Sequence, residues 1–184
     1  KHTSPAPTDS ALKVPSFFKQ NLKEVKRLNR ILSRKQQGSN NRDRAKRDVA
    51  RLYRRITNQR SAWQWKIARE LVERHAFIGF ETLNIKAMQL LWGRKIGDYG
   101  FSDFVSILQY AASKVGTQIV HVDKWYPSSQ LCSACGYRFN GTKDLSVRRW
   151  ICPHCGAEHN RDVNAACNIL TEALCIAGKQ QRAD

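Results

Sequence analysis

Residues 131–136 read LCSACG and residues 151–156 read ICPHCG, so two Cys-x2-Cys pairs stand sixteen residues apart. Two residues between cysteines let one tight turn present both sulfurs to one ion, and four thiolates satisfy tetrahedral Zn²⁺. A glycine follows each pair, and its tolerance of positive φ lets backbone N–H groups turn toward the sulfurs. The spacing predicts a zinc ribbon over residues 130–158 with a structural Zn²⁺ on four ligands: Cys132, Cys135, Cys152 and Cys155. A redox role is the alternative for either pair alone.

The other cysteines and histidines of this region are expected to have lesser roles. His154, between the cysteines of the second pair, is expected to be a side chain of the turn, and His159 is a candidate substitute ligand. Cys167 and Cys175 fall in an apolar helical pattern and are expected to be small buried residues.

The sequence on either side of the ribbon alternates between helix and strand patterns. Residues 162–177 repeat apolar residues at helical spacing, and residues 98–115 do the same before Gly116, a typical helix cap. Short apolar runs at 76–80 (AFIGF) and 118–122 (QIVHV) indicate strands, the first of them buried on both faces. The order predicts an α/β fold with the ribbon inserted before the last helix.

Two helices are predicted nearer the start of the chain. Apolar residues recur at helical spacing over residues 16–36 and again over residues 42–75, and the turn GSNN at 38–41 separates them, so an antiparallel hairpin is expected. The second helix would be about 50 Å long. Its apolar stripe is expected at seven positions: Ala45, Val49, Leu52, Ile56, Trp63, Ile67 and Leu71.

The charge of the chain is concentrated on this hairpin. The net charge is +17, and residues 13–74 hold nineteen lysines and arginines against five acids. Such an excess favours a polyanion, because each neutralised phosphate releases counterions; an acidic lipid or a solvated basic face are the alternatives. Trp65, Trp125 and Tyr126 are candidates to stack on bases, although Trp65 fits a helix core equally well. The candidate nucleic-acid contacts are Arg34, Lys35, Arg42, Arg44, Lys46, Arg47, Arg51, Arg54 and Arg55.

Two carboxylates occupy positions that suit a metal-dependent nuclease. Glu81 ends an apolar strand, and Asp162 opens a helix. Phosphodiester hydrolysis by two metal ions needs carboxylates from different elements, so that the ions activate water and stabilise the leaving oxygen. Each acid also has an ordinary interpretation: Glu81 as the first solvated residue after a strand, and Asp162 as a helix N-cap.

Four segments resemble, in order and spacing, the TnpB family of insertion-sequence-encoded RNA-guided nucleases, which is related to type V CRISPR effectors. They are residues 80–88 (FETLNIKAM), 125–136 (WYPSSQLCSACG), 152–156 (CPHCG) and 160–170 (NRDVNAACNIL). The basic hairpin resembles the family's helical segment, and the likeness covers roughly residues 13–174. The resemblance implies a RuvC-like (RNase H-type) nuclease fold, DNA as the target, a guide RNA from its own locus, and Mg²⁺ catalysis by three acids. Glu81 and Asp162 would be two of them.

The first acid of that family has no counterpart before Phe17. Family members carry it on an apolar N-terminal strand, whereas Asp9 lies in the sequence PTDS and Asp123 is expected to be a turn residue. We therefore expect the C-terminal part of such a protein, with a partial RuvC-like fold that lacks its first strands and is inactive alone.

The expected organisation has five parts: a disordered tail (1–12), a RuvC-like part (13–129) with the hairpin at 16–75, the ribbon, a last RuvC-like helix (159–178) and a tail (179–184). Two other functions stay open. One is a non-catalytic nucleic-acid-binding accessory or regulatory protein of a mobile element, and the other is a zinc module that docks to a protein. The hairpin charge favours phosphate over a protein groove.

The expected partners follow from the same features. DNA and guide RNA are the expected partners, and no small-molecule substrate is expected. No run of about 18 apolar residues occurs, so no membrane partner is expected. The expected location is the cytoplasm of a prokaryotic host of the mobile element, in association with the nucleoid.

Overall fold

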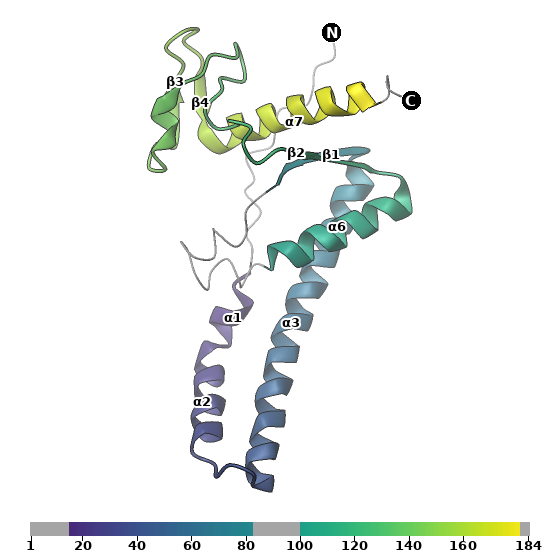
Figure 1. The fold of residues 1–184 in the computed structure, drawn as a ribbon, viewed down its shortest axis with the longest axis vertical. Coiled ribbons are helices and arrows are strands. Elements are labelled where there is room, and N and C mark those ends of the chain that lie inside the picture. The colour runs from purple at the N-terminus through teal and green to yellow at the C-terminus, as the bar shows by residue number, and fades with distance from the viewer. Residues whose placement is uncertain (1–14, 83–99, 181–184) are drawn as a thin grey trace. The chain divides into compact units, whose positions relative to one another are not determined.

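The computed structural model describes residues 15–82 and 100–180 of the chain (Figure 1). These residues form two units, one helical and one that contains the strands. The expectations for residues 1–12, 83–88 and 181–184 lie outside the described residues. None of the described helices is long and apolar enough to cross a membrane.

The helical unit confirms the predicted hairpin. α1 (Phe17–Gln20) and α2 (Leu22–Ser33) lead to the turn, and α3 (Asn40–Arg74) returns beside them (Figure 1). The first predicted helix is in fact two helices, which are separated at Asn21. The side chain of Asn21 donates to the carbonyl oxygen of Phe17 at 2.8 Å and so competes with the helical hydrogen bonds there.

The first half of α3 packs as the sequence predicts. Leu52 and Ile56 are buried with Val25 of α2, and Phe17, Phe18 and Leu28 complete this cluster. Ala45, nearer the turn, is buried on the same face.

The second half of α3 buries a different face. Gln64, Ala68 and Val72 are buried there, so the predicted stripe through Trp63, Ile67 and Leu71, which are half-buried, is shifted by one residue. The reason is α6 (Phe101–Val115), which contacts this half of α3, whereas α2 contacts the first half. The Nε2 of Gln64 donates to the carbonyl oxygen of Gly100 at 2.9 Å, directly before α6 begins.

The second unit has two parallel strands packed against a helix. β1 (Phe77–Glu81) pairs in register with β2 (Gln118–Val122), and α7 (Arg161–Gln180) contacts both. Val120 and Val122 are buried with two alanines of α7. The expectation that the first strand is buried on both faces is wrong: β1 is half-buried throughout, and β2 is its only strand partner among the described residues.

The ribbon contains a short antiparallel β-hairpin whose loop is the second cysteine turn, Cys152–Cys155. β3 (Arg149–Ile151) pairs with β4 (Glu158–Asn160), and a short 3-10 helix, η1 (Asn140–Lys143), precedes them. Trp150 is buried between Cys132 and Cys152 and stacks on the ring of Phe139 at 5.2 Å. β4 runs two residues past the predicted end of the ribbon and leads directly into α7.

The buried face of α7 differs from the expected one. Cys167 is half-buried and Cys175 is exposed, so the expectation of two buried cysteines is wrong. The reason is the rotation of the helix, which buries other residues instead: Asn164, Asn168, Ala173 and Ala177.

Candidate functional site

Glu81 lies on the face of β1 that packs against α7. Side chains alternate along a strand, so Phe77, Gly79 and Glu81 share a face, and Phe77 packs with Ala173 of α7. The approach is close, since a Cβ on Gly79 would lie 2.6 Å from the Cβ of Ala173. Burial raises the pKa of the Glu81 carboxyl above its ordinary value.

Asp162 stands in the first turn of α7 but does not cap it. The N–H groups of Asp162 and Val163 donate to Oδ1 of Asn160 at 3.0 and 3.3 Å, so Asn160 is the N-cap and the N-cap interpretation of Asp162 is wrong. The Asp162 side chain is 78% exposed, and its Oδ2 lies 3.6 Å from Nη1 of Arg148. An ion pair this exposed is weak, so the carboxylate is available to a ligand.

The elements that carry these two acids share one end of the unit. β1 and β2 run opposite to α7 (Figure 1), so the strand ends and the start of α7 lie toward the same side. Within residues 15–82 and 100–180, the only group of three or more potential metal ligands is the four-cysteine cluster. Glu81 and Asp162 are therefore at most a pair.

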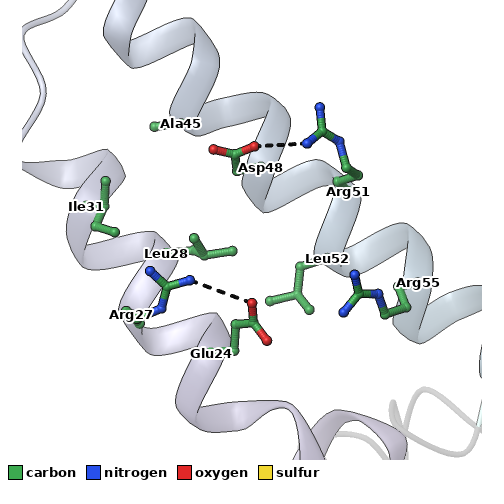
Figure 2. Close-up of a pocket in the computed structure, with 9 residues that line it drawn as sticks. All are labelled: Glu24, Arg27, Leu28, Ile31, Ala45, Asp48, Arg51, Leu52 and Arg55. Carbon is green, nitrogen blue, oxygen red and sulfur yellow. Dashed lines mark hydrogen bonds and ion pairs between the residues drawn. The ribbon is translucent and has the colours of Figure 1, made fainter.

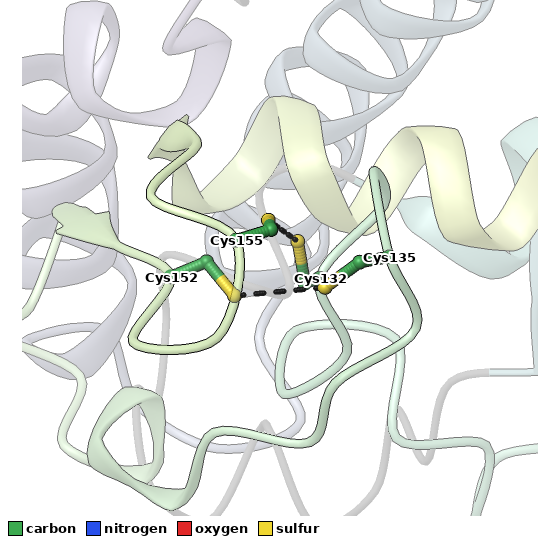
Figure 3. A group of neighbouring side chains, drawn as sticks. All are labelled: Cys132, Cys135, Cys152 and Cys155. Carbon is green, nitrogen blue, oxygen red and sulfur yellow. Dashed lines mark hydrogen bonds between the residues drawn. The ribbon is translucent and has the colours of Figure 1, made fainter.

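The four cysteines of the ribbon converge on one point, as their spacing predicts (Figure 3). The four sulfurs lie within 4.8 Å of one another. The Sγ–Sγ distance is 3.7 Å for Cys132 with Cys155 and for Cys135 with Cys152. This arrangement can hold one metal ion.

Both cysteine pairs form the same turn. The N–H of Gly136 donates to the carbonyl oxygen of Cys132 at 2.8 Å, and the N–H of Gly156 donates to that of Cys152 at 2.9 Å. The two glycines have φ of 75° and 74°, a region that side chains disfavour. The positive φ predicted for the glycine after each pair is confirmed, and the N–H of each glycine donates to a cysteine carbonyl oxygen.

The thiols of the cluster differ in acidity. Burial raises the pKa of the Cys152 thiol, but the backbone N–H groups of Cys155 and His154, with neighbouring thiols, outweigh burial and lower the pKa to about 7. The backbone N–H of Tyr137 lowers the pKa of Cys135, but burial and the three other thiols raise it to about 12. The crowded sulfurs thus favour the protonated form of Cys135, whereas the backbone N–H donors favour the thiolate of Cys152.

The two ribbon histidines lie beside the cluster. The Nε2 of His159 is 3.0 Å from Sγ of Cys132, and its ring lies 4.7 Å from that of Trp150. The ring of His154 stacks on Tyr137 at 5.7 Å. His159 is thus a neighbour of one sulfur and does not belong to the group of four.

Two asparagines that the sequence analysis did not single out bind the ribbon to α7. Oδ1 of Asn164 accepts from the N–H of Ser133 at 2.9 Å, and its Nδ2 donates to the carbonyl oxygen of Leu131 at 2.6 Å. The Nδ2 of Asn168 donates to the carbonyl oxygens of Ser128 and Leu131 at 2.8 and 2.7 Å. The sequence signal that could have identified them is their i, i+4 spacing on a helix face of small residues. Buried amide side chains at such positions need hydrogen-bond partners.

The loop before the ribbon contains the expected turn at Asp123. Oδ1 of Asp123 accepts from the N–H of Trp125 at 2.7 Å, which confirms Asp123 as a turn residue. Trp125 is 80% exposed.

The fold itself uses one of the nine basic candidates. Nη1 of Arg42 donates to the carbonyl oxygens of Leu32 and Lys35 at 3.2 and 2.9 Å, and so closes the turn between α2 and α3. Oγ of Ser39 accepts from the Arg42 N–H at 3.2 Å and caps α3. This guanidinium thus adds a side-chain donor to carbonyl oxygens in the last turn of α2 and in the turn that follows it.

The other eight candidates project from the hairpin. Lys46 pairs with Asp43 at 3.4 Å and Arg51 with Asp48 at 3.3 Å, both on the surface. Six form no ion pair with any described residue: Arg34, Lys35, Arg44, Arg47, Arg54 and Arg55.

A groove of about 300 Å³ lies between α2 and α3 (Figure 2). Leu28 and Leu52 form part of its apolar floor. On its rim Arg27 pairs with Glu24 at 3.7 Å, and Arg51 pairs with Asp48 (Figure 2). Both acids of the groove pair with arginines and leave only Arg55 unpaired there, so the unpaired arginines outside the groove are the better phosphate ligands.

Two family models match the chain. Residues 4–91 match the OrfB_IS605 model, described as a probable transposase, and residues 101–169 match the model of the Cas12f1-like TNB domain.

Similar proteins agree with these models. A protein of Streptomyces pristinaespiralis, whose curated name describes an RNA-guided DNA endonuclease, is 36% identical over 165 residues, which are 89% of this chain and 40% of that protein. The TnpB-like protein L79 of Acanthamoeba polyphaga mimivirus is 30% identical over 171 residues, which are 88% of this chain and 32% of that protein. The chain thus spans less than half the length of these relatives.

The fold is also found in a solved structure. A cryo-EM structure of a Cas12f1–sgRNA–target DNA complex superposes with a TM-score of 0.55 and 19% identity, over 83% of this chain and 41% of that chain. At this identity the likeness shows the fold alone, which agrees with the expected α/β class. The models, the relatives and the fold agree, and the chain belongs to the TnpB-type (OrfB) family, as part of such a protein.

Proposed function

We propose that this chain is part of an RNA-guided, Mg²⁺-dependent DNA endonuclease and supplies two carboxylates of its nuclease centre, Glu81 and Asp162. The observation that carries the proposal is that Glu81 ends β1 on the strand face that packs against α7, while Asn160, and not Asp162, caps α7. Mg²⁺ bound there would activate water and stabilise the leaving oxygen of a phosphodiester. The half-buried Glu81 would gain from such a cation, because burial disfavours its charged form.

The chain alone is proposed to lack nuclease activity. The TnpB family uses three acids, and Glu81 and Asp162 would be only two of them. Hydrolysis of DNA is therefore a property proposed for the whole protein, with the guide RNA supplied by its own locus.

We infer that the metal of the ribbon is zinc. A tetrahedral ion with Zn–S bonds of about 2.3 Å would hold its sulfurs about 3.8 Å apart. The two Sγ–Sγ distances of 3.7 Å fit that geometry, and the four thiolates leave no open position for a substrate. The role of the ion is then structural.

The basic hairpin is proposed to bind the phosphates of guide RNA and DNA. Six of its nine candidate cations have no carboxylate partner in the described part of the chain, so phosphate would relieve their mutual repulsion. Nucleoid association in a prokaryotic cytoplasm would follow from such binding.

The carboxylate proposal can be tested with Mn²⁺ as a probe for Mg²⁺, since carboxylate oxygens suit both ions. Free Mn²⁺ would be measured by electron paramagnetic resonance with the chain and with Glu81→Gln, Asp162→Asn and the control Asp48→Asn, which alters a surface ion pair of α3. Both site variants should weaken binding at least about fivefold, and the control should not. Equal binding by all four proteins would overturn the proposal. Salt-dependent nucleic-acid binding would then favour a non-catalytic accessory protein.

A further inference from the structure

One face of α3 carries basic residues in a continuous line. Arg44, Arg47, Arg51 and Arg54 follow one another at intervals of three or four residues, so they lie on one side of the helix, and all four are exposed. This side is not the one that buries Leu52 against α2. Of the four, only Arg51 forms an ion pair within the described residues, on the surface with Asp48.

The line continues into the second half of α3 and ends on an aromatic pair. The same spacing passes through exposed Asn58 and Ala62 to Trp65 and Arg69. Trp65 contacts Tyr110 of α6 edge to face, with ring centroids 5.8 Å apart at 83°. From Arg44 to Arg69 the line is about 38 Å long.

Each ring of this pair has a cation beside it. The Arg69 guanidinium lies 5.9 Å from the Trp65 centroid, and Nζ of Lys114 lies 5.1 Å from the Tyr110 centroid. Trp65 is half-buried, whereas Tyr110 is 56% exposed. Tyr110 is therefore the ring that offers a free surface, and Trp65 is the support that fixes its orientation.

We propose that this side of α3 binds single-stranded nucleic acid, with phosphates along the arginine line and an unpaired base stacked on Tyr110. The proposal rests on the proposed binding of nucleic acid by the hairpin and adds a place where a base is held. Bases inside a duplex are stacked on each other and cannot offer a face, so Tyr110 selects single strands. Lys114 and Arg69 would neutralise the phosphates on either side of the stacked base.

The alternatives to a nucleic acid fit this surface less well. Between Arg44 and Trp65 the line contains no large apolar side chain that could enter a membrane or a protein groove. The surface offers positive charge and an exposed aromatic ring. A polyanion that contains flat aromatic rings complements both features.

The test compares the binding of the whole chain to an unstructured single-stranded oligonucleotide and to a closed-ended duplex of similar length. The key variant is Tyr110→Leu, with Tyr110→Phe to keep the ring. The matched control is Tyr53→Leu, because Tyr53 is a 41% exposed tyrosine of α3 that stacks on Phe18 away from the line. Circular dichroism would verify that each variant keeps its helices.

We expect Tyr110→Leu to weaken single-strand binding about tenfold and duplex binding less than about twofold. Tyr110→Phe and Tyr53→Leu should bind both ligands like the unchanged chain. A 5-iodouracil placed in the oligonucleotide should crosslink to Tyr110. Loss of binding to both ligands in equal measure, or no loss for either, would overturn the stacking site.

The proposed binding by the hairpin is judged separately with Arg44→Gln, Arg47→Gln and Arg54→Gln combined. This variant should weaken binding to single strands and duplex alike. If it does so while Tyr110→Leu has no effect, the stacking site is refuted and hairpin binding stands. If the triple variant binds both ligands normally, hairpin binding itself is refuted, and the stacking proposal falls with it.

Discussion

Asn164 holds the backbone of Ser133, since its Oδ1 accepts the Ser133 N–H at 2.9 Å across thirty-one residues of sequence. Ser133 directly follows the metal-ligand candidate Cys132, and Asn164 is two residues beyond Asp162. One buried amide therefore joins the first cysteine turn to the helix that carries the proposed catalytic acid.

Removing this amide should loosen the ribbon. Asn164→Ala leaves the Ser133 N–H without this partner, at a cost of about 1–3 kcal/mol, whereas the Leu131 carbonyl keeps its hydrogen bond from Asn168. The unfolding midpoint should fall and metal release should accelerate, as followed by calorimetry and a chromogenic chelator. The exposed Asn58→Ala is the matched control. Unchanged metal release in Asn164→Ala would contradict the coupling.

The ribbon should take up one zinc ion per chain, with an affinity that rises with pH. Zinc binds thiolates and displaces their protons, so acid opposes binding. Cys152, with its pKa lowered to about 7, should contribute to the slope of log affinity against pH mainly below neutral pH. Cys135, with its pKa raised to about 12, should contribute over the whole accessible range.

The measurement is elemental analysis followed by competition with a chelator at several pH values. Metal removal should unfold the ribbon and leave the helical signal of the other unit. A folded ribbon without metal, or an affinity independent of pH, would refute a four-thiolate site.

Neutralising the arginine line should change the salt dependence of binding. Each phosphate contact on a duplex contributes about 0.9 to the slope of log K against log salt, so the combined change of Arg44, Arg47, Arg51 and Arg54 to Gln should reduce the slope by up to about 3.6. Arg42→Gln is the informative comparison. Its Nη1 bonds to two carbonyls, so it should mainly lower the hairpin's stability. An unchanged slope would mean that the line is only a solvated surface.

The chain alone should not cut nucleic acid. Two ions about 3.5–4 Å apart need more carboxylate oxygens than Glu81 and Asp162 provide. The assay incubates the chain with Mg²⁺ or Mn²⁺ and single- or double-stranded DNA, with and without RNA from its locus. Cleavage that disappears in Glu81→Ala would show that another acid, Asp9 or Asp123, completes the centre.

Gly79 should not tolerate a side chain. A Cβ there would lie 2.6 Å from the Cβ of Ala173, so Gly79→Ala should destabilise this unit by about 1–3 kcal/mol. Chemical denaturation measures the loss. Adding Ala173→Gly should restore part of it, because the combined volume returns to that of the unchanged chain. Gly178→Ala, where nothing lies within 4 Å, is the control.

The sequence predicts best the features that depend on neighbouring residues. The cysteine turns, the helix cap at Gly116 and both parallel strands follow from local spacing and are confirmed. The shift of the buried stripe to Gln64 does not follow, because it depends on the side from which α6 approaches.

The features of the candidate site also divide into those that local spacing predicts and those that depend on residues far apart in the sequence. The convergence of the four sulfurs was readable from the chain, whereas the partners of Asn164 lie thirty-one and thirty-three residues away. Asn160 could have been recognised as the N-cap, since asparagine before a helix is a common cap, but Asp162 competed for that role. The contribution of Glu81 and Asp162 to catalysis remains a prediction.

α3 is held from two sides, because one buried face packs on α2 and another packs on α6. The face around Leu52 and the face around Ala68 are separated by about 140° around the axis, at 3.6 residues per turn. α3 cannot rotate to tighten its packing on α2 without loosening its packing on α6. A substitution that turns α3 about its axis at Leu52 should therefore also disturb the contact of α3 with α6, the helix that carries Tyr110.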